Sequence, residues 1–183
     1  MERVPGDTSV LPIPASEKGL VRNLMQAYRH DLSEFDGASP DESGSYGVGS
    51  YFDAYWTEPV RYPFKVLVGD VLAGFALVRE LAPQTYCMAE FFILRRHRKS
   101  GVGREAAFAL FRKFPGTWHV AEDEHNLPAQ RFWRSVIDEH SGGDFTEEWS
   151  ESQPRGPKQV FVAGGLKIGR DHGTQTASLR SSL

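Results

Sequence analysis

The residues best suited to chemistry lie in one short stretch, Arg98-Lys99-Ser100-Gly101-Val102-Gly103-Arg104. The stretch follows an apolar run expected to form a strand and precedes an amphipathic run expected to form a helix. At a helix start, several backbone N–H groups lack intrahelical partners and the peptide dipoles add partial positive charge, so an anion is favoured. Glycines let that backbone approach a bulky pyrophosphate closely. The stretch therefore suits a nucleotide-like anion.

The cationic side chains of the stretch strengthen this interpretation. Arg98, Lys99 and Arg104 would add charge-assisted hydrogen bonds to phosphate oxygens. An alternative stays open, in which Gly101 and Gly103 only shape a tight turn and the basic side chains are solvated. A Walker loop is excluded because no Gly-Lys-Ser or Gly-Lys-Thr closes the motif, and a dinucleotide-binding fingerprint needs a different glycine spacing.

Hydrophobic periodicity predicts the elements that precede this stretch. Residues 16–32 predict a first helix capped by Ser16. The apolar stripe of that helix consists of Val21, Leu24, Met25, Tyr28 and Leu32. Residues 62–68 and 71–79 are rich in Val, Leu and Phe, and the Gly69-Asp70 pair between them suits a tight turn, so they predict an antiparallel hairpin.

The next elements place the stretch between a buried strand and a helix. Residues 86–94 are apolar on both faces near their end, which indicates a central strand that contains Glu90. Residues 104–114 have helical periodicity and stop at Pro115-Gly116. A short strand at 118–121, a helix at 129–137 with Pro128 in its first turn, and strands near 145–149 and 159–163 complete the chain. The order predicts a mixed α/β chain with one twisted sheet flanked by helices.

Length and composition bound the architecture and the class of partner. The 183 residues fit one domain, placed at residues 1–165 and followed by a polar tail at 166–183 that we expect to be disordered. Residues 36–45 predict a surface loop. The net charge of -3 argues against a protein built to wrap nucleic acid, although the basic run at 95–99 leaves a nucleic-acid-binding module as a less favoured alternative.

Cysteine usage and hydropathy bear on the compartment. The single cysteine, Cys87, excludes an internal disulfide, suits a reducing compartment and is interpreted as a small packed strand residue. Neither a signal-peptide run nor an apolar segment of membrane-spanning length is present. We therefore expect a cytoplasmic protein without a membrane partner.

Two motifs together resemble one family. Arg98-x-x-Gly101-x-Gly103 between a strand and a helix resembles the acetyl-coenzyme A signature of the GNAT N-acetyltransferase superfamily, which is Gln or Arg, two residues, Gly, one residue, then Gly or Ala. A later segment resembles the family's Asn-x-x-Ala-x-x-aromatic-aromatic pattern. It reads Asn126-Leu127-Pro128-Ala129-Gln130-Arg131-Phe132-Trp133. The resemblance covers roughly residues 8–165.

The resemblance implies an α/β (α+β) fold with one mixed, mostly antiparallel twisted sheet and a splayed parallel pair at its centre. Acetyl-CoA, the co-substrate, would thread its pantetheine arm between the strands at 92–94 and 118–121. The implied cofactor contacts are backbone groups of Phe92, Ile93 and Leu94, the Arg98 side chain, amides of Lys99, Ser100, Gly101, Val102, Gly103 and Arg104, and the inner border formed by Asn126, Phe132 and Trp133. Asn126 is equally suited to capping a helix.

The activity that the resemblance implies is transfer of the acetyl group to a primary amine of a small molecule or peptide, by direct attack in a ternary complex. Glu90 is the first candidate for the general base, because a carboxylate in an apolar strand is costly unless it is solvated, paired or used. Solvation or an arginine partner is the open alternative. His119 is the second candidate, on the strand expected to face Glu90 across the splay, and packing or exposure is its alternative role.

Three further features qualify this expectation. Trp133 stands where many family members carry the tyrosine that protonates the leaving thiolate, and an indole N–H cannot do so, so an acetyl-CoA sensor without transfer activity is an alternative. The aromatic residues of segment 46–56 could line the acceptor pocket or pack in the core. The acidic run 122–125 is interpreted as solvated, and no metal is expected. A monomer and a homodimer both remain open.

Overall fold

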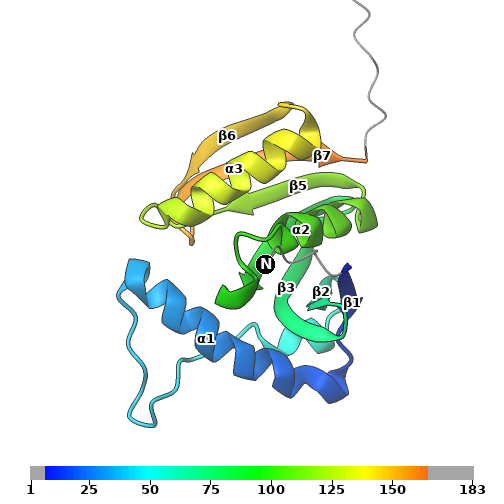
Figure 1. Cartoon of the computed structure of the whole chain (residues 1–183). Helices are drawn as coiled ribbons and strands as arrows, with labels where there is room; N and C mark the ends of the chain where they lie inside the picture. Colours follow the sequence, from blue (N-terminus) through cyan, green and yellow to red (C-terminus); the bar gives the residue numbers. More distant parts are fainter. Residues whose placement is uncertain (1–6, 165–183) are drawn as a thin grey trace, which may run out of the picture.

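A seven-stranded mixed sheet forms the centre of the computed structural model, which describes residues 7–164 (Figure 1). Its strand order is β1-β2-β3-β4-β5-β7-β6. The strands are β1 (Thr8–Pro12), β2 (Arg61–Val68), β3 (Val71–Ala82), β4 (Thr85–Ile93), β5 (Gly116–Ala121), β6 (Phe145–Ser150) and β7 (Gly156–Ala163). Strands β4 and β5 are parallel, whereas the other neighbouring pairs are antiparallel. The predicted fold class is confirmed.

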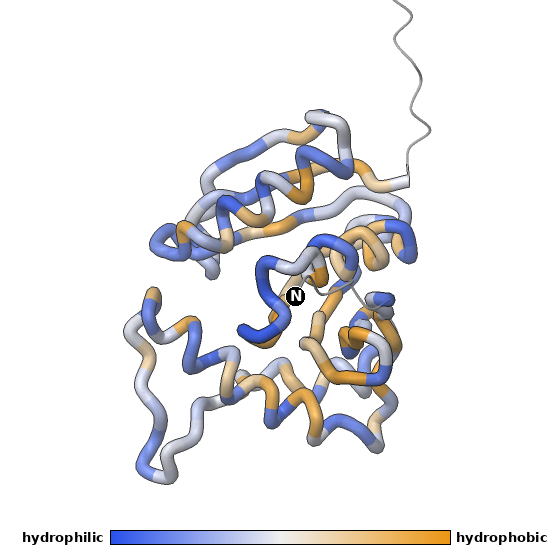
Figure 2. The backbone as a smooth tube through the Cα atoms, viewed as in Figure 1, coloured by the Kyte–Doolittle hydropathy of each residue, from blue (hydrophilic) through white to orange (hydrophobic). Residues whose placement is uncertain are grey.

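Helices cover both faces of the sheet. They are α1 (Lys18–Asp36), α2 (Val102–Lys113) and α3 (Leu127–Ser141). Alternate residues of β3 show the two layers, because Ala76 packs in the cluster that holds α2 and α3 side chains, whereas Phe75 packs in the cluster that holds α1 side chains. The hydropathy colouring of Figure 2 shows apolar stretches around β2, β3 and α2, while the loop after α1 is mainly polar.

The hairpin and the helix ends follow local rules. Strands β2 and β3 pair in antiparallel fashion from Arg61↔Arg79 to Val68↔Val71, and the turn at Gly69 has φ of 58°, as predicted for a tight hairpin. Helices α1 and α3 each end at a glycine in the left-handed region, which accepts this conformation without strain. Pro128 lies in the first turn of α3, where a proline removes no needed N–H donor.

Two features of the N-terminal part differ from the sequence prediction. Strand β1 pairs with β2 and was not predicted, since its short segment contains few apolar residues in alternation. Helix α1 begins at Lys18, and the residue before it is Glu17, whose side chain makes no capping hydrogen bond. Ser16 lies in the preceding 3-10 turn (Ala15–Glu17) and does not cap the helix. The prediction of Ser16 as the cap was wrong.

The remaining expectations about chain organisation fall partly outside the described residues. Residues 37–45 form an irregular, mostly exposed loop, as predicted, although α1 extends to Asp36. The predicted tail at 166–183 lies outside the described residues, so the domain boundary stays a prediction. Within residues 7–164, the helices are too short or too polar to traverse a bilayer.

Candidate active site

The two parallel strands at the centre of the sheet pair only at their beginnings. Their register contains Thr85↔Thr117, Tyr86↔Trp118 and Cys87↔His119. Strand β4 then continues to Ile93, and β5 to Ala121, without further pairing between them. Because unpaired backbone groups of two strands face each other there, the sheet has a gap that a ligand can enter. The predicted splay is confirmed.

A bulge in β4 sets which side chains reach this gap. Leu77 of β3 faces Glu90, and the next residue, Val78, faces Met88, so Ala89 is the extra residue in β4. Met88 and Glu90 lie on opposite faces of the sheet although they are two positions apart, because the bulge absorbs Ala89. Met88 packs in the cluster with α2 and α3, and Glu90 lies on the α1 face.

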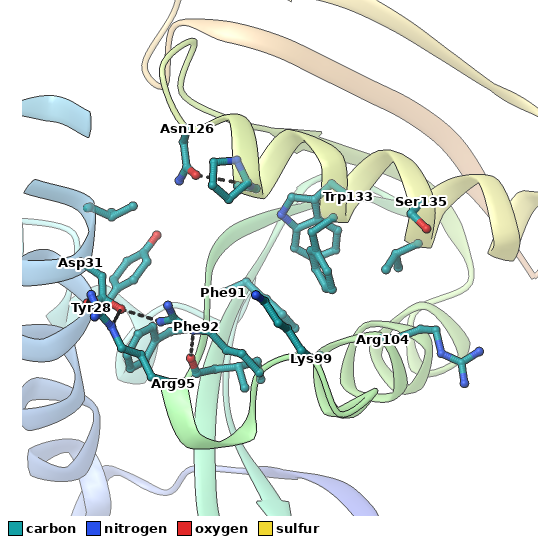
Figure 3. Close-up of a pocket in the computed structure, with 18 of the residues that line it drawn as sticks. Tyr28, Asp31, Phe91, Phe92, Arg95, Lys99, Arg104, Asn126, Trp133 and Ser135 are labelled. Atoms are coloured by element: carbon teal, nitrogen blue, oxygen red, sulfur yellow. Dashed lines mark hydrogen bonds and ion pairs between the residues drawn. The ribbon is translucent and has the colours of Figure 1, made fainter. Parts of the chain in front are cut away.

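A cleft of about 720 Å³ lies next to the gap, between α1 and α3 (Figure 3). Its walls come from the second half of α1, the end of β4, the loop that leads to α2, and the first half of α3. The residues that line it are Tyr28, Asp31, Leu32, Glu34, Phe35, Phe91, Phe92, Ile93, Arg95, Arg98, Lys99, Gly101, Gly103, Arg104, Asn126, Pro128, Ala129, Phe132, Trp133, Ser135 and Val136. Most of the predicted cofactor contacts therefore surround one cavity.

The two glycines of the turn before α2 have different physical roles. Gly101 is the N-cap of α2 with φ of 86°, a conformation that other residues adopt only with strain, and a Cβ there would meet open space. A Cβ on Gly103 would lie 3.2 Å from the Phe132 ring of α3. Gly101 therefore shapes the turn, and Gly103 permits close packing of α2 against α3. The first N–H groups of α2 have no intrahelical partner and lie at the cleft.

Two of the three basic side chains of the motif, Arg98 and Arg104, are paired with carboxylates. Arg98 contacts Asp31 of α1 at 2.5 Å, and its Nε donates to the backbone oxygen of Ile93 at 2.7 Å. Arg104 contacts Glu105 at 2.8 Å and Glu139 at 2.6 Å, and Figure 3 shows its side chain directed away from the cavity. Such partly exposed ion pairs are weak and can exchange partners. Arg98 and Arg104 are therefore partly exposed and ion-paired, and their predicted contacts with phosphate stay a prediction.

Backbone direction selects which β4 residues face the gap. The N–H of Leu94 donates to the oxygen of Ala73 on β3 at 2.8 Å, and the oxygen of Phe92 also points toward β3, against Gly74. Because successive residues of a strand point their N–H and C=O groups to opposite edges, Phe91 and Ile93 present theirs to the gap. Of the three residues predicted to offer backbone groups to the pantetheine arm, Phe92, Ile93 and Leu94, Ile93 alone faces the gap. Phe91 faces the gap as well, although it was not predicted.

The carboxylate of Glu90 is half-buried on the α1 face. Burial raises its pKa, while hydrogen bonds from the hydroxyl groups of Tyr51 and Tyr28 and the charge of Arg29 act in the opposite direction. Two hydroxyl donors hold the carboxylate in place, and Tyr51 is 37% exposed, so this side is open to solvent. A positioned carboxylate with a raised pKa suits proton transfer near neutral pH.

The second candidate, His119, lies elsewhere than expected. It pairs with Cys87 in the closed part of the two strands, before the gap opens. Burial and the charge of Lys158 lower its pKa, and the charge of Glu148 raises it. The two charged residues that shift the pKa of His119 therefore lie on β6 and β7. Cys87 itself is half-buried, and burial raises the pKa of its thiol, which suits the predicted packing role.

The second motif forms the α3 wall of the cleft. The Asn126 side chain accepts a hydrogen bond from the N–H of Ala129 at 3.1 Å, so it caps α3 while also lining the cleft. Phe132 stacks on Phe91 with ring centroids 6.0 Å apart, and Trp133 meets the same ring edge-on at 5.0 Å. The aromatic pair fixes the distance between α3 and the free part of β4.

The aromatic segment 46–56 divides between core and site. Phe52 is buried under α1, and Trp56 packs against it, as the core interpretation expects. Tyr51 contacts Glu90, and Tyr55 lies beside Tyr51 with ring centroids 6.4 Å apart. Tyr55 is itself buried, so the core interpretation holds for Phe52, Tyr55 and Trp56, and the acceptor-pocket interpretation stays a prediction for Tyr51.

The acidic run contains one residue that sequence reasoning placed wrongly. Glu122, directly after β5, is only 4% exposed and is not solvated. It accepts a hydrogen bond from Gln159 at 3.1 Å, and its Oε1 atom has no hydrogen-bond partner. Burial raises its pKa to about 8. Residues 7–164 contain no group of three or more side chains arranged to hold a metal ion.

Comparison with known proteins places these features in a family. The Acetyltransferase (GNAT) family matches residues 18–136, well over half of the chain. A search among curated proteins gives no match. Both motifs and all three helices fall wholly or largely inside the matched range.

Solved structures share the fold at low sequence identity. An acetyltransferase from Thermus thermophilus has a TM-score of 0.65 and 16% identity, covering 86% of this chain and 98% of its own. Aminoglycoside acetyltransferase AAC(6')-Ib in complex with coenzyme A has a TM-score of 0.60 and 13% identity. The match covers 85% of this chain and 95% of the aminoglycoside acetyltransferase. The PaiA N-acetyltransferase from Thermoplasma acidophilum in complex with coenzyme A has a TM-score of 0.57 and 7% identity, covering 85% and 99%. The chain belongs to the GNAT family of acetyltransferases, which confirms the resemblance and the enzyme class predicted from its two motifs.

Proposed function

We propose that this protein transfers the acetyl group of acetyl-CoA to a primary amine of a small molecule or peptide, by direct attack in a ternary complex. The observation that carries the proposal is the continuity between the cleft and the gap. The cleft runs from the glycine turn along the free end of β4, and Glu90 lies on the same strand, on the α1 face.

The residues present fit acetyl-CoA as co-substrate. Amides from Lys99 to Arg104 would hold the pyrophosphate, because the helix start supplies free N–H donors and Gly101 leaves open space for a close approach. The backbone groups of Phe91 and Ile93 would bond the pantetheine arm once Arg98 releases the Ile93 oxygen. Asn126, Phe132 and Trp133 would border the inner end.

Residues of the α1 face would then serve the acceptor. An amine entering beside the exposed Tyr51 meets Glu90, which accepts a proton from the amine nitrogen as that nitrogen bonds to the acetyl carbon. The exposed aromatic ring of Tyr51 and the carboxylate suit a cationic amine before it loses its proton. Positioning of both substrates supplies much of the rate. His119 is kept as the second candidate base.

One observation favours a second candidate function. Trp133 is 6% exposed and packs against Phe91, and its indole N–H is no proton source for a departing thiolate. A protein that binds acetyl-CoA and senses it without transfer would fit this residue. The nucleic-acid alternative is weakened, because Arg95 and Arg98 both pair with Asp31 and present less free charge.

The proposal is tested with the full chain in two steps. Calorimetric titration with CoA should show binding, and thiol release from acetyl-CoA should appear with one or more members of an amine panel. Gly101→Ala should weaken CoA binding about tenfold, because the Cβ intrudes where phosphate approaches, while Gly44→Ala is a matched control with φ of 78° and open space around it. No binding at millimolar CoA would remove the cofactor; binding without thiol release would favour the sensor.

A further inference from the structure

We propose that Tyr28 is a catalytic residue that passes a proton from Glu90 to the thiolate leaving group. The proposal rests on the acetyl transfer proposed above and names the proton donor that Trp133 does not supply. Tyr28 lies in the middle of α1, far from the family motifs in sequence. Its position between the cleft and Glu90 is the observation that carries the inference.

The ring of Tyr28 is held firmly. It packs edge-on against Phe75, with ring centroids 5.7 Å apart, and at a tilt of 50° against Phe92, with ring centroids 5.5 Å apart. Phe92 belongs to the free part of β4, so the ring of Tyr28 is anchored at the gap. Figure 3 shows the Tyr28 hydroxyl group directed into the cavity. A hydroxyl on a fixed ring can donate to a ligand atom with little loss of conformational entropy.

Tyr28 connects the two sides of the reaction. Glu90 has hydrogen bonds with two tyrosines, Tyr28 and Tyr51. Tyr28 lines the cleft, whereas Tyr51 is not among its lining residues. Tyr51 therefore holds Glu90 from the acceptor side, and Tyr28 links Glu90 to the space that the thioester would occupy.

The charge state of Glu90 controls the acidity of Tyr28. Burial is the largest cause of the raised pKa of Tyr28, and the negative charge of Glu90 is the next. When Glu90 accepts the proton of the amine, that charge disappears and the pKa of Tyr28 falls. Tyr28 thus becomes a better donor at the moment when the thiolate forms.

The proton transfers balance without another reactant. The amine nitrogen bonds to the acetyl carbon and loses one proton to Glu90, while the carbon–sulfur bond breaks and its electron pair stays on sulfur. Tyr28 gives its hydroxyl proton to that sulfur and receives the proton of Glu90. Glu90 returns to the carboxylate and Tyr28 to the phenol, so amide and thiol are the only products.

Tyr28→Phe tests the inference with an amine that the wild type accepts. We expect kcat to fall about 100-fold with the KM for acetyl-CoA and the affinity for CoA unchanged. Tyr62→Phe is the matched control, since Tyr62 also donates to a carboxylate, that of Glu80 at 3.1 Å, and does not line the cleft; its kcat should stay within twofold. An equal kcat in Tyr28→Phe and wild type would overturn the inference while leaving acetyl transfer intact.

A second variant guards against a folding defect. Fluorotyrosine at position 28 keeps the ring and the hydroxyl group but lowers the hydroxyl pKa. We expect kcat at neutral pH to change progressively across mono-, di- and trifluorotyrosine as the hydroxyl pKa falls, which a purely structural role for Tyr28 would not produce. A kcat that does not depend on the number of fluorine atoms would count against the inference. A wild type without thiol release on any amine would instead reject the proposed function itself.

Discussion

Two glutamates at the central parallel strands differ in their surroundings. Glu90 is half-buried in the free part of β4, and Glu122 is buried directly after β5. Burial raises the pKa of both carboxyl groups. Glu90 has two tyrosine donors, one of them at the cleft and one exposed, whereas Glu122 has the amide of Gln159 and is closed off from solvent.

The difference teaches that a raised pKa does not identify a general base. Glu122 is the more deeply buried of the two side chains and has the more clearly raised pKa. Only Glu90 has a path to both proposed substrates, through Tyr51 on one side and Tyr28 on the other. Access to reacting atoms, together with hydrogen-bond donors that hold the carboxylate, separates the functional candidate from the structural one.

The largest expected effect comes from Glu90→Gln. Loss of the proton acceptor should lower kcat by about 1,000-fold at neutral pH and should abolish the acid limb of the pH–rate profile. Glu122→Gln should keep kcat within threefold, because that side chain lies outside the cleft. Steady-state thiol-release kinetics over pH 5–9 provide the measurement. Similar losses in both variants would break the distinction between the two glutamates.

The next effect concerns stability and belongs to Glu122. Its pKa of about 8 in the folded chain exceeds the usual value of 4.5, so the folded state binds more protons than the unfolded state between these values. Stability should therefore fall as pH rises through this window, by about 2 kcal/mol once local relaxation is allowed. Urea unfolding of wild type and Glu122→Gln at pH 5 and 8.5 measures it, and the variant should lack this part of the fall.

The smallest effect is expected from Tyr51→Phe. The hydrogen bond from Tyr51 lowers the pKa of Glu90, so its removal should raise that pKa and move the acid limb of the pH–rate profile upward by about one unit. At high pH the rate should stay within about threefold of wild type. Tyr46→Phe is the control, because its ring meets His30 instead. A limb that stays in place would mean that Tyr51 does not tune Glu90.

Local signals explain what the sequence could predict. The hairpin turn at Gly69, the glycine turn before α2 and the cap at Asn126 depend on near neighbours, and the structure shows all three. The glycine turn between a strand and a helix supported the resemblance to the GNAT family, and that resemblance implied the gap between the two parallel strands. Glu90 was chosen as a candidate base because an acid in an apolar strand stands out by residue type alone, and its role stays a prediction.

Tertiary contacts explain what the sequence could not predict. Tyr28 was assigned to the apolar stripe of its helix, and nothing in that stripe shows that its hydroxyl reaches Glu90. Glu122 was assigned to a solvated run, because its burial depends on α3 and β7 closing over it. The pairing of Arg98 with Asp31 joins residues far apart in the chain. The sequence signal for such a contact is a tyrosine within an apolar stripe, because a hydroxyl group that is buried there needs a hydrogen-bond partner.

The extra residue at Ala89 also constrains how this chain can vary. The bulge absorbs that residue, so its deletion would straighten β4 and leave the pairing of Val78 with Met88 and of Leu77 with Glu90 in place. A further residue that no bulge absorbed would instead slip the register by one and exchange the faces of everything from Glu90 to Ile93. Loss of one residue here is therefore compatible with the present arrangement of side chains, whereas gain of one in the regular part of β4 is not.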